Sequence, residues 1–246
     1  MTHPNIIKII CHDIGKHLGC YGVKSVSTKA IDALAKNGIL FENSYATSPG
    51  CSPSRAAIAT GLYPHNNGVL GLAHAHFGWS LDEKVHHIAK YFLKNAYNSI
   101  LFGLQHVTYN EKSLGFKKIF PERPADAVVK NIRENIDSNL FKKPFYAEIN
   151  FFEPHRPFDF GGVKPFKSKG ISVPEYIPNN HDIRKEFASM QGAIKKMDDS
   201  VGKIINILKR TNLYENTIIL FTTDHGIPFP RAKGTLYDLS LIHISE

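Results

Sequence analysis

Short apolar runs alternate with amphipathic stretches along the whole chain. Residues 5–11 form a β-branched run that ends in a polar, glycine-rich stretch, which predicts a buried strand that feeds a loop. Further strands are predicted at 39–45, 99–102, 145–152 and 217–222. Between them the pattern changes to a helical period, and short Pro- and Gly-containing segments separate the elements.

The helical segments complete the alternation. Ser27 is placed to cap a helix whose apolar residues share one face, and Gly38 follows its end. Further helices are predicted at 53–60, 83–95, 125–138 and 182–211. Alternating strands and helices favour an α/β fold with a mostly parallel sheet. Residues 154–178, rich in Pro, Gly and Lys, are predicted to form an ordered excursion near a site.

Composition narrows the class of protein. With 246 residues, 42% of them hydrophobic and 21% charged, the chain is typical of a globular protein with a substantial core. The formal charge of +8 suits a polyanion, whether nucleic acid, anionic lipid or sulfated sugar, without choosing among them. Three cysteines without a C-x-x-C spacing exclude a disulfide scaffold. The early apolar run is too short for a signal peptide or membrane span, so we expect a soluble, cytoplasmic protein.

Polar side chains follow the first and last predicted strands. His12 and Asp13 come directly after the first strand, and Asp224 and His225 follow the last. In a parallel sheet the carboxyl ends of neighbouring strands meet at one edge, where reactive groups gather. These four residues therefore have the placement of a divalent-metal site.

The most specific motif in the chain is Cys51-Ser52-Pro53-Ser54-Arg55, followed after four residues by Thr60-Gly61. It resembles the sulfatase signature C-x-P-S-R-x-x-x-x-T-G at every fixed position. The resemblance implies that a formylglycine-generating enzyme oxidises Cys51 to formylglycine, whose hydrated aldehyde attacks sulfur and forms a covalent sulfate intermediate. It also implies the alkaline-phosphatase-like α/β fold, a mostly parallel sheet flanked by helices.

The motif also makes physical sense by itself. A nucleophile at a helix N-terminus lies among unpaired backbone N–H groups and the positive end of the helix dipole, which favours a bound sulfate or phosphate. Arg55, one turn further on, can hydrogen-bond the oxygens of the nucleophile. If Cys51 stayed a thiol, we expect the same field to lower its pKa.

The resemblance extends to the metal ligands. Asp13 matches one of the paired N-terminal aspartates that bind a divalent metal in sulfatases, and Asp224 and His225 match the later ligand pair. Carboxylate oxygens suit Ca²⁺, the ion that the resemblance favours. The first aspartate of the family is His12 here, and an imidazole ligand favours Mn²⁺ or Zn²⁺.

Three further residues match family positions that touch sulfate or the leaving group. His106 lies in Gly103-Leu104-Gln105-His106, where sulfatases carry Gly-Lys-x-His, so Leu104 replaces a lysine. His155 resembles the histidine offered to the leaving-group oxygen, and Lys233 matches a late lysine that contacts sulfate. Of the other histidines, we expect His86 and His87 to face solvent.

The resemblance also bears on the extent of the domain. Residues 1–238 are predicted to be an N-terminal sulfatase catalytic domain that lacks its C-terminal strands and subdomain. Residues 239–246 resemble the conceptual translation of a sequencing adapter and are predicted to be a non-native tail, although a genuine terminal strand is the alternative. On this reading the chain is a fragment and is itself poorly stable.

Segments 154–157 and 221–230 look most like the heparan N-sulfatase (sulfamidase) branch and its bacterial relatives. We therefore expect hydrolysis of a sulfate ester or sulfamate on a sulfated glycan, aminosugar or small molecule, with no nucleic-acid or membrane partner. One alternative is a phosphoester or phosphonate monoester hydrolase on the same fold, against which the loss of a lysine at Leu104 argues. Another is a non-catalytic anion- or glycan-binding protein in which Cys51 stays unmodified.

Overall fold

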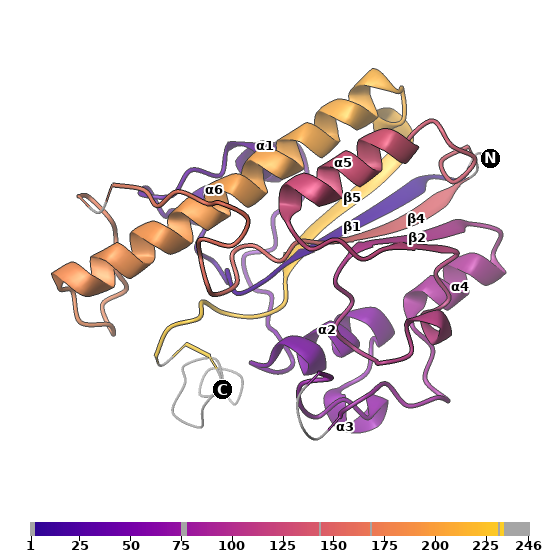
Figure 1. The fold of residues 1–246 in the computed structure, drawn as a ribbon, viewed down its shortest axis with the longest axis horizontal. Coiled ribbons are helices and arrows are strands. Elements are labelled where there is room, and N and C mark those ends of the chain that lie inside the picture. Colours follow the sequence, from indigo (N-terminus) through magenta and orange to yellow (C-terminus); the bar gives the residue numbers. More distant parts are fainter. Residues whose placement is uncertain (1–2, 75–77, 143, 168, 231, 234–246) are drawn as a thin grey trace.

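Five parallel strands form the centre of the computed structural model (Figure 1). The structure describes residues 3–74, 78–142, 144–167, 169–230 and 232–233. The strands are β1 (Asn5–Cys11), β2 (Asn98–Gly103), β3 (Lys118–Phe120), β4 (Phe145–Asn150) and β5 (Thr217–Thr223). They lie in the order β3-β2-β4-β1-β5, so the first and last strands of the sequence are neighbours.

Helices cover both faces of the sheet (Figure 1). On one face lie α1 (Lys29–Asn37), α5 (Ala125–Asn135) and α6 (His181–Arg210), and on the other α2 (Cys51–Thr60), α3 (Pro64–Asn67) and α4 (Ile88–Lys94). Short 3-10 helices are found at Gly19–Tyr21, Glu111–Leu114 and Tyr214–Asn216. None of the described helices is long and apolar enough to cross a membrane.

The main core lies between the sheet and the pair α5 and α6. Strands β2 and β4 are buried along their whole length, as expected for a parallel sheet covered on both faces. Helix α6 contributes an apolar stripe at helical spacing, with Ile194, Met197 and Val201 fully buried. The prediction of an α/β fold with a parallel sheet is confirmed.

Some predicted elements are wrong. Residues 39–45 form no strand, and Ile39 and Phe41 are 84% and 65% exposed. Ile39, Phe41 and Tyr45 have high β propensity, but a strand also needs a hydrogen-bonding neighbour, and none of the described strands pairs with this segment. The first helix begins at Lys29 after Thr28 rather than after Ser27. Strand β3 and helix α3 have only three and four residues and were not predicted.

Most predicted boundaries shift by a few residues for local reasons. Helix α4 begins at Ile88 instead of residue 83, because the Nδ1 atom of His87 accepts a hydrogen bond from the amide of Ala89 (3.1 Å) and caps the helix. Residues 154–178 contain no helix or strand among their described positions, in agreement with the prediction of an excursion. The predicted tail at 239–246 lies outside the described residues.

Candidate active site

Cys51 is the first residue of α2 and lies beside the carboxyl ends of β1 and β5. Pro53 occupies the first turn of α2, where its missing N–H costs no helical hydrogen bond. The Cys51 side chain is buried, with its Sγ 3.3 Å from His225 Nε2 and 3.8 Å from Lys233 Nζ. The predicted nucleophile therefore sits at a helix N-terminus between a histidine and a lysine.

Asp224 is the centre of the buried hydrogen-bond network. Its Oδ1 accepts from the backbone amides of Asp13 (3.0 Å) and His225 (2.9 Å). Its Oδ2 accepts from Arg55 Nε at 3.0 Å. Burial opposes ionisation, but His12, His225 and Arg55 hold the pKa of Asp224 well below its usual range. This carboxylate therefore stays charged and orients the Arg55 guanidinium.

The Asp13 carboxylate contacts two side chains, those of Lys233 and His225. Lys233 Nζ lies 2.8 and 2.9 Å from the two carboxylate oxygens of Asp13, and His225 Nε2 lies 3.1 Å from Oδ1. Burial opposes the charge of Lys233, but Asp13 and Cys51 raise its pKa. Asp13 and His106 both have positive φ, at 55° and 62°, so backbone strain of the kind found at functional sites is present here.

The environment of the Cys51 thiol corrects one expectation. Burial, followed by the charges of Asp224 and Asp13, raises the pKa of Cys51 to about 12. These effects outweigh Lys233 and Arg55, which act in the opposite direction. The helix N-terminus therefore does not make Cys51 a thiolate, and a free-thiol nucleophile loses its physical support.

His12 is buried, and its two ring nitrogens differ in their surroundings. Nδ1 lies 3.0 Å from Asp224 Oδ2, a contact with a charged group, and Nε2 has no partner among the described residues. Burial and then Arg55 lower the pKa of His12 to about 4. The imidazole is therefore neutral near pH 7 and available as a ligand.

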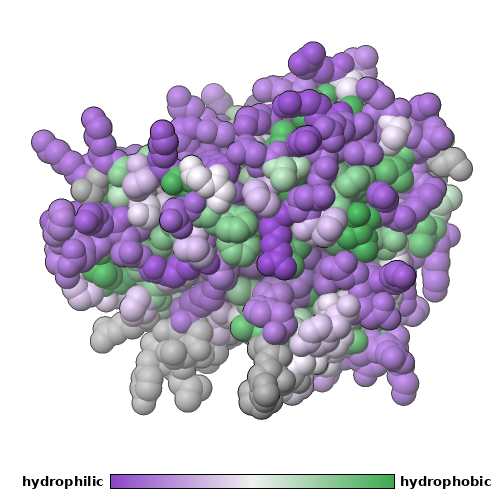
Figure 2. Space-filling view, in the orientation of Figure 1, coloured by the Kyte–Doolittle hydropathy of each residue, from purple (hydrophilic) through white to green (hydrophobic). Residues whose placement is uncertain are grey.

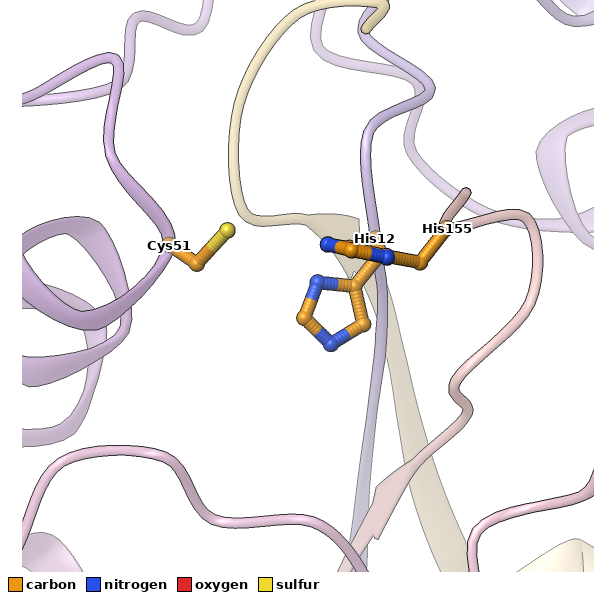
Figure 3. A group of neighbouring side chains, drawn as sticks. All are labelled: His12, Cys51 and His155. Atoms are coloured by element: carbon orange, nitrogen blue, oxygen red, sulfur yellow. The ribbon is translucent and has the colours of Figure 1, made fainter. Parts of the chain in front are cut away.

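The two other predicted catalytic histidines lie around His12. The His155 ring meets the His12 ring edge-on with centroids 5.1 Å apart, and the His106 centroid is 6.2 Å from that of His12. His106 also stacks on His74, with centroids 4.3 Å apart. Burial and then Arg55 lower the pKa of His106 to about 2. Figure 3 shows the Cys51 side chain on one side and the imidazoles of His12 and His155 facing it.

Two overlapping groups of side chains could hold a metal ion. One consists of His12, Asp13, Cys51 and Asp224, whose ligand atoms all lie within 4.8 Å of one another. The other consists of His12, Cys51 and His155 at the same limit. All nine predicted site residues thus gather at one end of the sheet: His12, Asp13, Cys51, Arg55, His106, His155, Asp224, His225 and Lys233.

Sequence reasoning missed several residues behind the site. Asn150, at the end of β4, accepts a hydrogen bond from Arg55 Nη1 at 3.2 Å. His87, predicted to face solvent, is buried 3.7 Å from Glu148, because helix α4 turns it toward the sheet. The sequence did contain one signal for this buried network, namely the charged residue Glu148 within a mostly apolar strand. Beside the site lies a cavity of about 600 Å³ whose lining includes His74, His106 and Arg123.

Comparisons with known proteins show which family the chain is similar to. Residues 4–240 match the sequence profile of the family described as Sulfatase. Human N-sulphoglucosamine sulphohydrolase is 25% identical over 95% of this chain and 52% of its own length. An ulvan-active sulfatase of Formosa agariphila is 30% identical over 97% of this chain and 47% of its own length. The chain thus spans about half the length of the curated relatives it matches.

Solved structures show the same fold. A sulfatase structure from work on glycosaminoglycan metabolism in Bacteroides thetaiotaomicron superposes with a TM-score of 0.77 at 20% identity, over 91% of this chain and 61% of that one. A phosphonate monoester hydrolase of Agrobacterium radiobacter gives 0.70 at 20% identity, over 91% and 63%. The alkaline-phosphatase-like α/β fold is therefore confirmed.

Proposed function

The chain belongs to the sulfatase family, and we propose that its protein hydrolyses a sulfate ester or sulfamate on a glycan through a nucleophile made from Cys51. The observation that supports this most is the setting of Cys51. It begins α2, with Lys233 and His225 in contact with its sulfur and Arg55 one turn further along the same helix. Lys233, Arg55 and the start of α2 thus place donors and cationic side chains beside the position that a bound sulfate would occupy.

The chain's own residues have distinct tasks in this reaction. Formylglycine at position 51, as a hydrated aldehyde, supplies the oxygen nucleophile. Arg55 and Lys233 neutralise charge on the sulfate as it is attacked, and Arg55 Nη2 makes no hydrogen bond to any described residue. His155, at the mouth of the site, is placed to give a proton to the leaving oxygen or nitrogen.

The donor set around His12 fits a divalent cation. His12 Nδ1 lies 3.0 Å from Asp224 Oδ2, and the buried Nε2 has a lone pair without a partner among the described residues. We propose that His12, Asp13 and Asp224 would hold such an ion, with His225 beside it, and that the bound ion would supply Lewis-acid stabilisation of charge on the sulfate. Two carboxylates and one imidazole favour Mn²⁺ or Zn²⁺ over Ca²⁺, which prefers six to eight oxygen ligands.

The test is sulfate release by protein co-expressed with a formylglycine-generating enzyme, assayed on sulfated and N-sulfated glucosamine. We expect turnover to depend on Cys51, with an aldehyde detectable at that position by mass spectrometry. Cys51→Ala should abolish turnover, whereas Cys20→Ser, which changes the half-buried cysteine near Asp32, should leave it intact. Full turnover in Cys51→Ala would refute the proposal.

The choice of a glycan substrate rests on the relatives. Their names refer to N-sulphoglucosamine, ulvan and N-acetylgalactosamine-6-sulfate, all of them carbohydrates. A basic chain with a formal charge of +8 suits such polyanions. A panel of sulfated mono- and disaccharides would separate the sulfamate from the ester substrates.

A second candidate activity is hydrolysis of a phosphonate or phosphate monoester. It is favoured by the fold shared with the phosphonate monoester hydrolase. Leu104 counts against it, because a dianionic phosphate needs more positive charge than a sulfate monoanion. Assays of matched aryl sulfate, phosphate and phosphonate esters would decide, since the proposal expects the sulfate to give the highest kcat/KM.

A further inference from the structure

Three side chains of types that bind metal ions lie close together beside the carboxyl end of β1, although they come from different parts of the chain. His12 follows β1, Cys51 begins α2 and His155 lies in the loop after β4 (Figure 3). Their ligand atoms lie within 4.8 Å of one another. A tetrahedral zinc ion holds sulfur and nitrogen ligands roughly 3.3–3.7 Å apart. Side-chain movements of about 1 Å would therefore close this group around one ion.

The burial of His12 is a second observation that points to a bound ion. His12 is 1% exposed. Nδ1 lies 3.0 Å from Asp224 Oδ2, which places the ring proton on Nδ1 and leaves the lone pair on Nε2. Nε2 contacts no described partner, and buried ring nitrogens are generally satisfied, so this lone pair is free to bind a metal ion.

His155 is already oriented as a ligand. Its Nδ1 lies 2.5 Å from the carbonyl oxygen of Arg156. A carbonyl only accepts hydrogen bonds, so the ring proton is on Nδ1 and the lone pair is on Nε2. In histidines that bind metals, the N–H of the second ring nitrogen commonly donates a hydrogen bond to a backbone carbonyl in this way. The Phe152 ring, with its centroid 5.0 Å from that of His155, provides an apolar wall.

The sulfur and nitrogen donors differ in kind from the carboxylates nearby. Asp13 has Lys233 as a partner at 2.8 Å and Asp224 has Arg55 at 3.0 Å. Among the described residues no cationic side chain hydrogen-bonds to His12 or His155, and Lys233 Nζ is 3.8 Å from the Cys51 sulfur. One thiolate and two neutral imidazoles form a donor set that selects zinc-type ions over calcium or magnesium.

We propose that, while Cys51 is a thiol, the chain binds a zinc-type divalent cation through Cys51, His12 and His155, with a fourth position open to water. Binding forms a metal–sulfur bond, and the thiol proton passes to solvent. No redox change occurs. The metal-thiolate form and the proposed hydrolase exclude each other, because both require the side chain at position 51.

The test is a Co²⁺ titration of metal-free protein made without a formylglycine-generating enzyme. We expect visible bands of tetrahedral cobalt and a near-ultraviolet sulfur-to-cobalt charge-transfer band that saturates at one ion per chain, and Zn²⁺ should remove both. Cys51→Ser should abolish the charge-transfer band, and the matched control Cys20→Ser should retain it. His155→Ala should weaken Co²⁺ binding by about tenfold or more.

A second measurement uses the wild-type chain, so it tests metal binding even if one of the variants fails to fold. In the wild-type chain, Zn²⁺ should slow alkylation of Cys51 relative to Cys20, as followed by peptide mass spectrometry. Cobalt binding without a charge-transfer band, lost in Asp13→Asn but unchanged in His155→Ala, would assign the ion to the carboxylates and overturn the proposal. Unprotected Cys51 would do the same. Because no substrate is used, these results do not depend on whether the matured protein is a sulfatase.

Discussion

Asn150 accepts a hydrogen bond from Arg55, whose Nη1 atom lies 3.2 Å from Asn150 Oδ1. The amide nitrogen of the same Asn150 side chain donates to Glu148 Oε1 at 3.0 Å. Arg55 is thus held between Asn150 and Asp224, and its Nη2 is left without a hydrogen bond to any described residue. The buried polar groups within the sheet therefore fix the direction in which the Arg55 guanidinium points.

Removing this contact should impair catalysis as well as weaken the fold. In Asn150→Ala, Arg55 loses one of its two anchors, and a hydrogen bond to a charged group contributes about 1.5–3 kcal/mol. We expect kcat/KM for sulfate release to fall roughly 10- to 100-fold in protein that is still folded at the assay temperature. The melting temperature should fall too, because Asn150 is buried and also donates to Glu148. The control is Asn131→Ala, which removes an exposed bond to Glu122. A wild-type kcat/KM in Asn150→Ala would show that Asp224 alone positions the guanidinium.

The other end of this network is a buried ion pair that supports the fold. Lys8 Nζ lies 2.9 Å from Glu148 Oε2, and the Tyr146 hydroxyl donates to the same oxygen at 2.7 Å. Burial opposes ionisation of Glu148, but Lys8 and then His87 lower its pKa. The Glu148 carboxylate therefore stays charged inside the protein, beside Lys8.

Breaking the pair on one side should destabilise the chain. Glu148→Gln leaves the Lys8 ammonium buried without a countercharge, at a cost of about 3–5 kcal/mol in the free energy of unfolding. Urea denaturation would measure this, with Glu134→Gln as the control, because the Lys130–Glu134 pair is exposed and contributes under about 0.5 kcal/mol. The double variant Lys8→Met/Glu148→Leu should recover much of the loss, and equal instability of the single and double variants would contradict this.

The sequence predicts the contact between Asp13 and Asp224 but misses the ion pair between Lys8 and Glu148, and the difference has a physical reason. Asp13 and Asp224 follow apolar strands, and parallel strands end at a common edge, so their meeting was predictable. Lys8 and Glu148 interact only because they are direct partners in the β1–β4 register. Sequence alternation identifies strands but not which strand lies next to which, so cross-strand pairs stay hidden until the order is known.

Buried His87 should make the fold sensitive to acid. Burial lowers the pKa of His87 to about 4 from an ordinary value of 6.5, despite Glu148, and Lys8 acts in the same direction as burial. The folded state thus favours neutral His87, so its contribution is complete above pH 6.5 and is lost as the pH falls toward 4. From about pH 7.5 to about pH 4.5 the loss is roughly 2–3 kcal/mol.

The measurement is the free energy of unfolding in urea across that range. His87→Asn keeps a side-chain oxygen that can cap α4 at Ala89 but has no group that titrates. Its stability should fall less steeply with acid than that of the wild type, although His12, His17 and His106, whose pKa values are also lowered, still contribute in both proteins. Parallel curves for the two proteins would mean that His87 is already charged in the fold.

The outer edge of β5 should promote self-association. β5 pairs with β1, and no other strand among the described residues pairs with it. Ile218 and Leu220 on this strand are 49% and 50% exposed. An edge strand with free backbone groups and exposed apolar side chains is a template for pairing with another chain. We therefore expect the 246-residue chain to associate as its concentration rises.

Lysine at the two β5 positions should suppress this association, because a charged edge opposes strand pairing. Sedimentation velocity over a concentration series would compare the wild type with Ile218→Lys/Leu220→Lys. The control is Leu70→Lys/Leu93→Lys, since these leucines are 54% and 42% exposed away from β5 and the variant adds the same two charges. Equal suppression by the control would show that general surface hydropathy, and not the β5 edge, governs association. A wild-type chain that stays monomeric at every concentration would contradict the prediction itself.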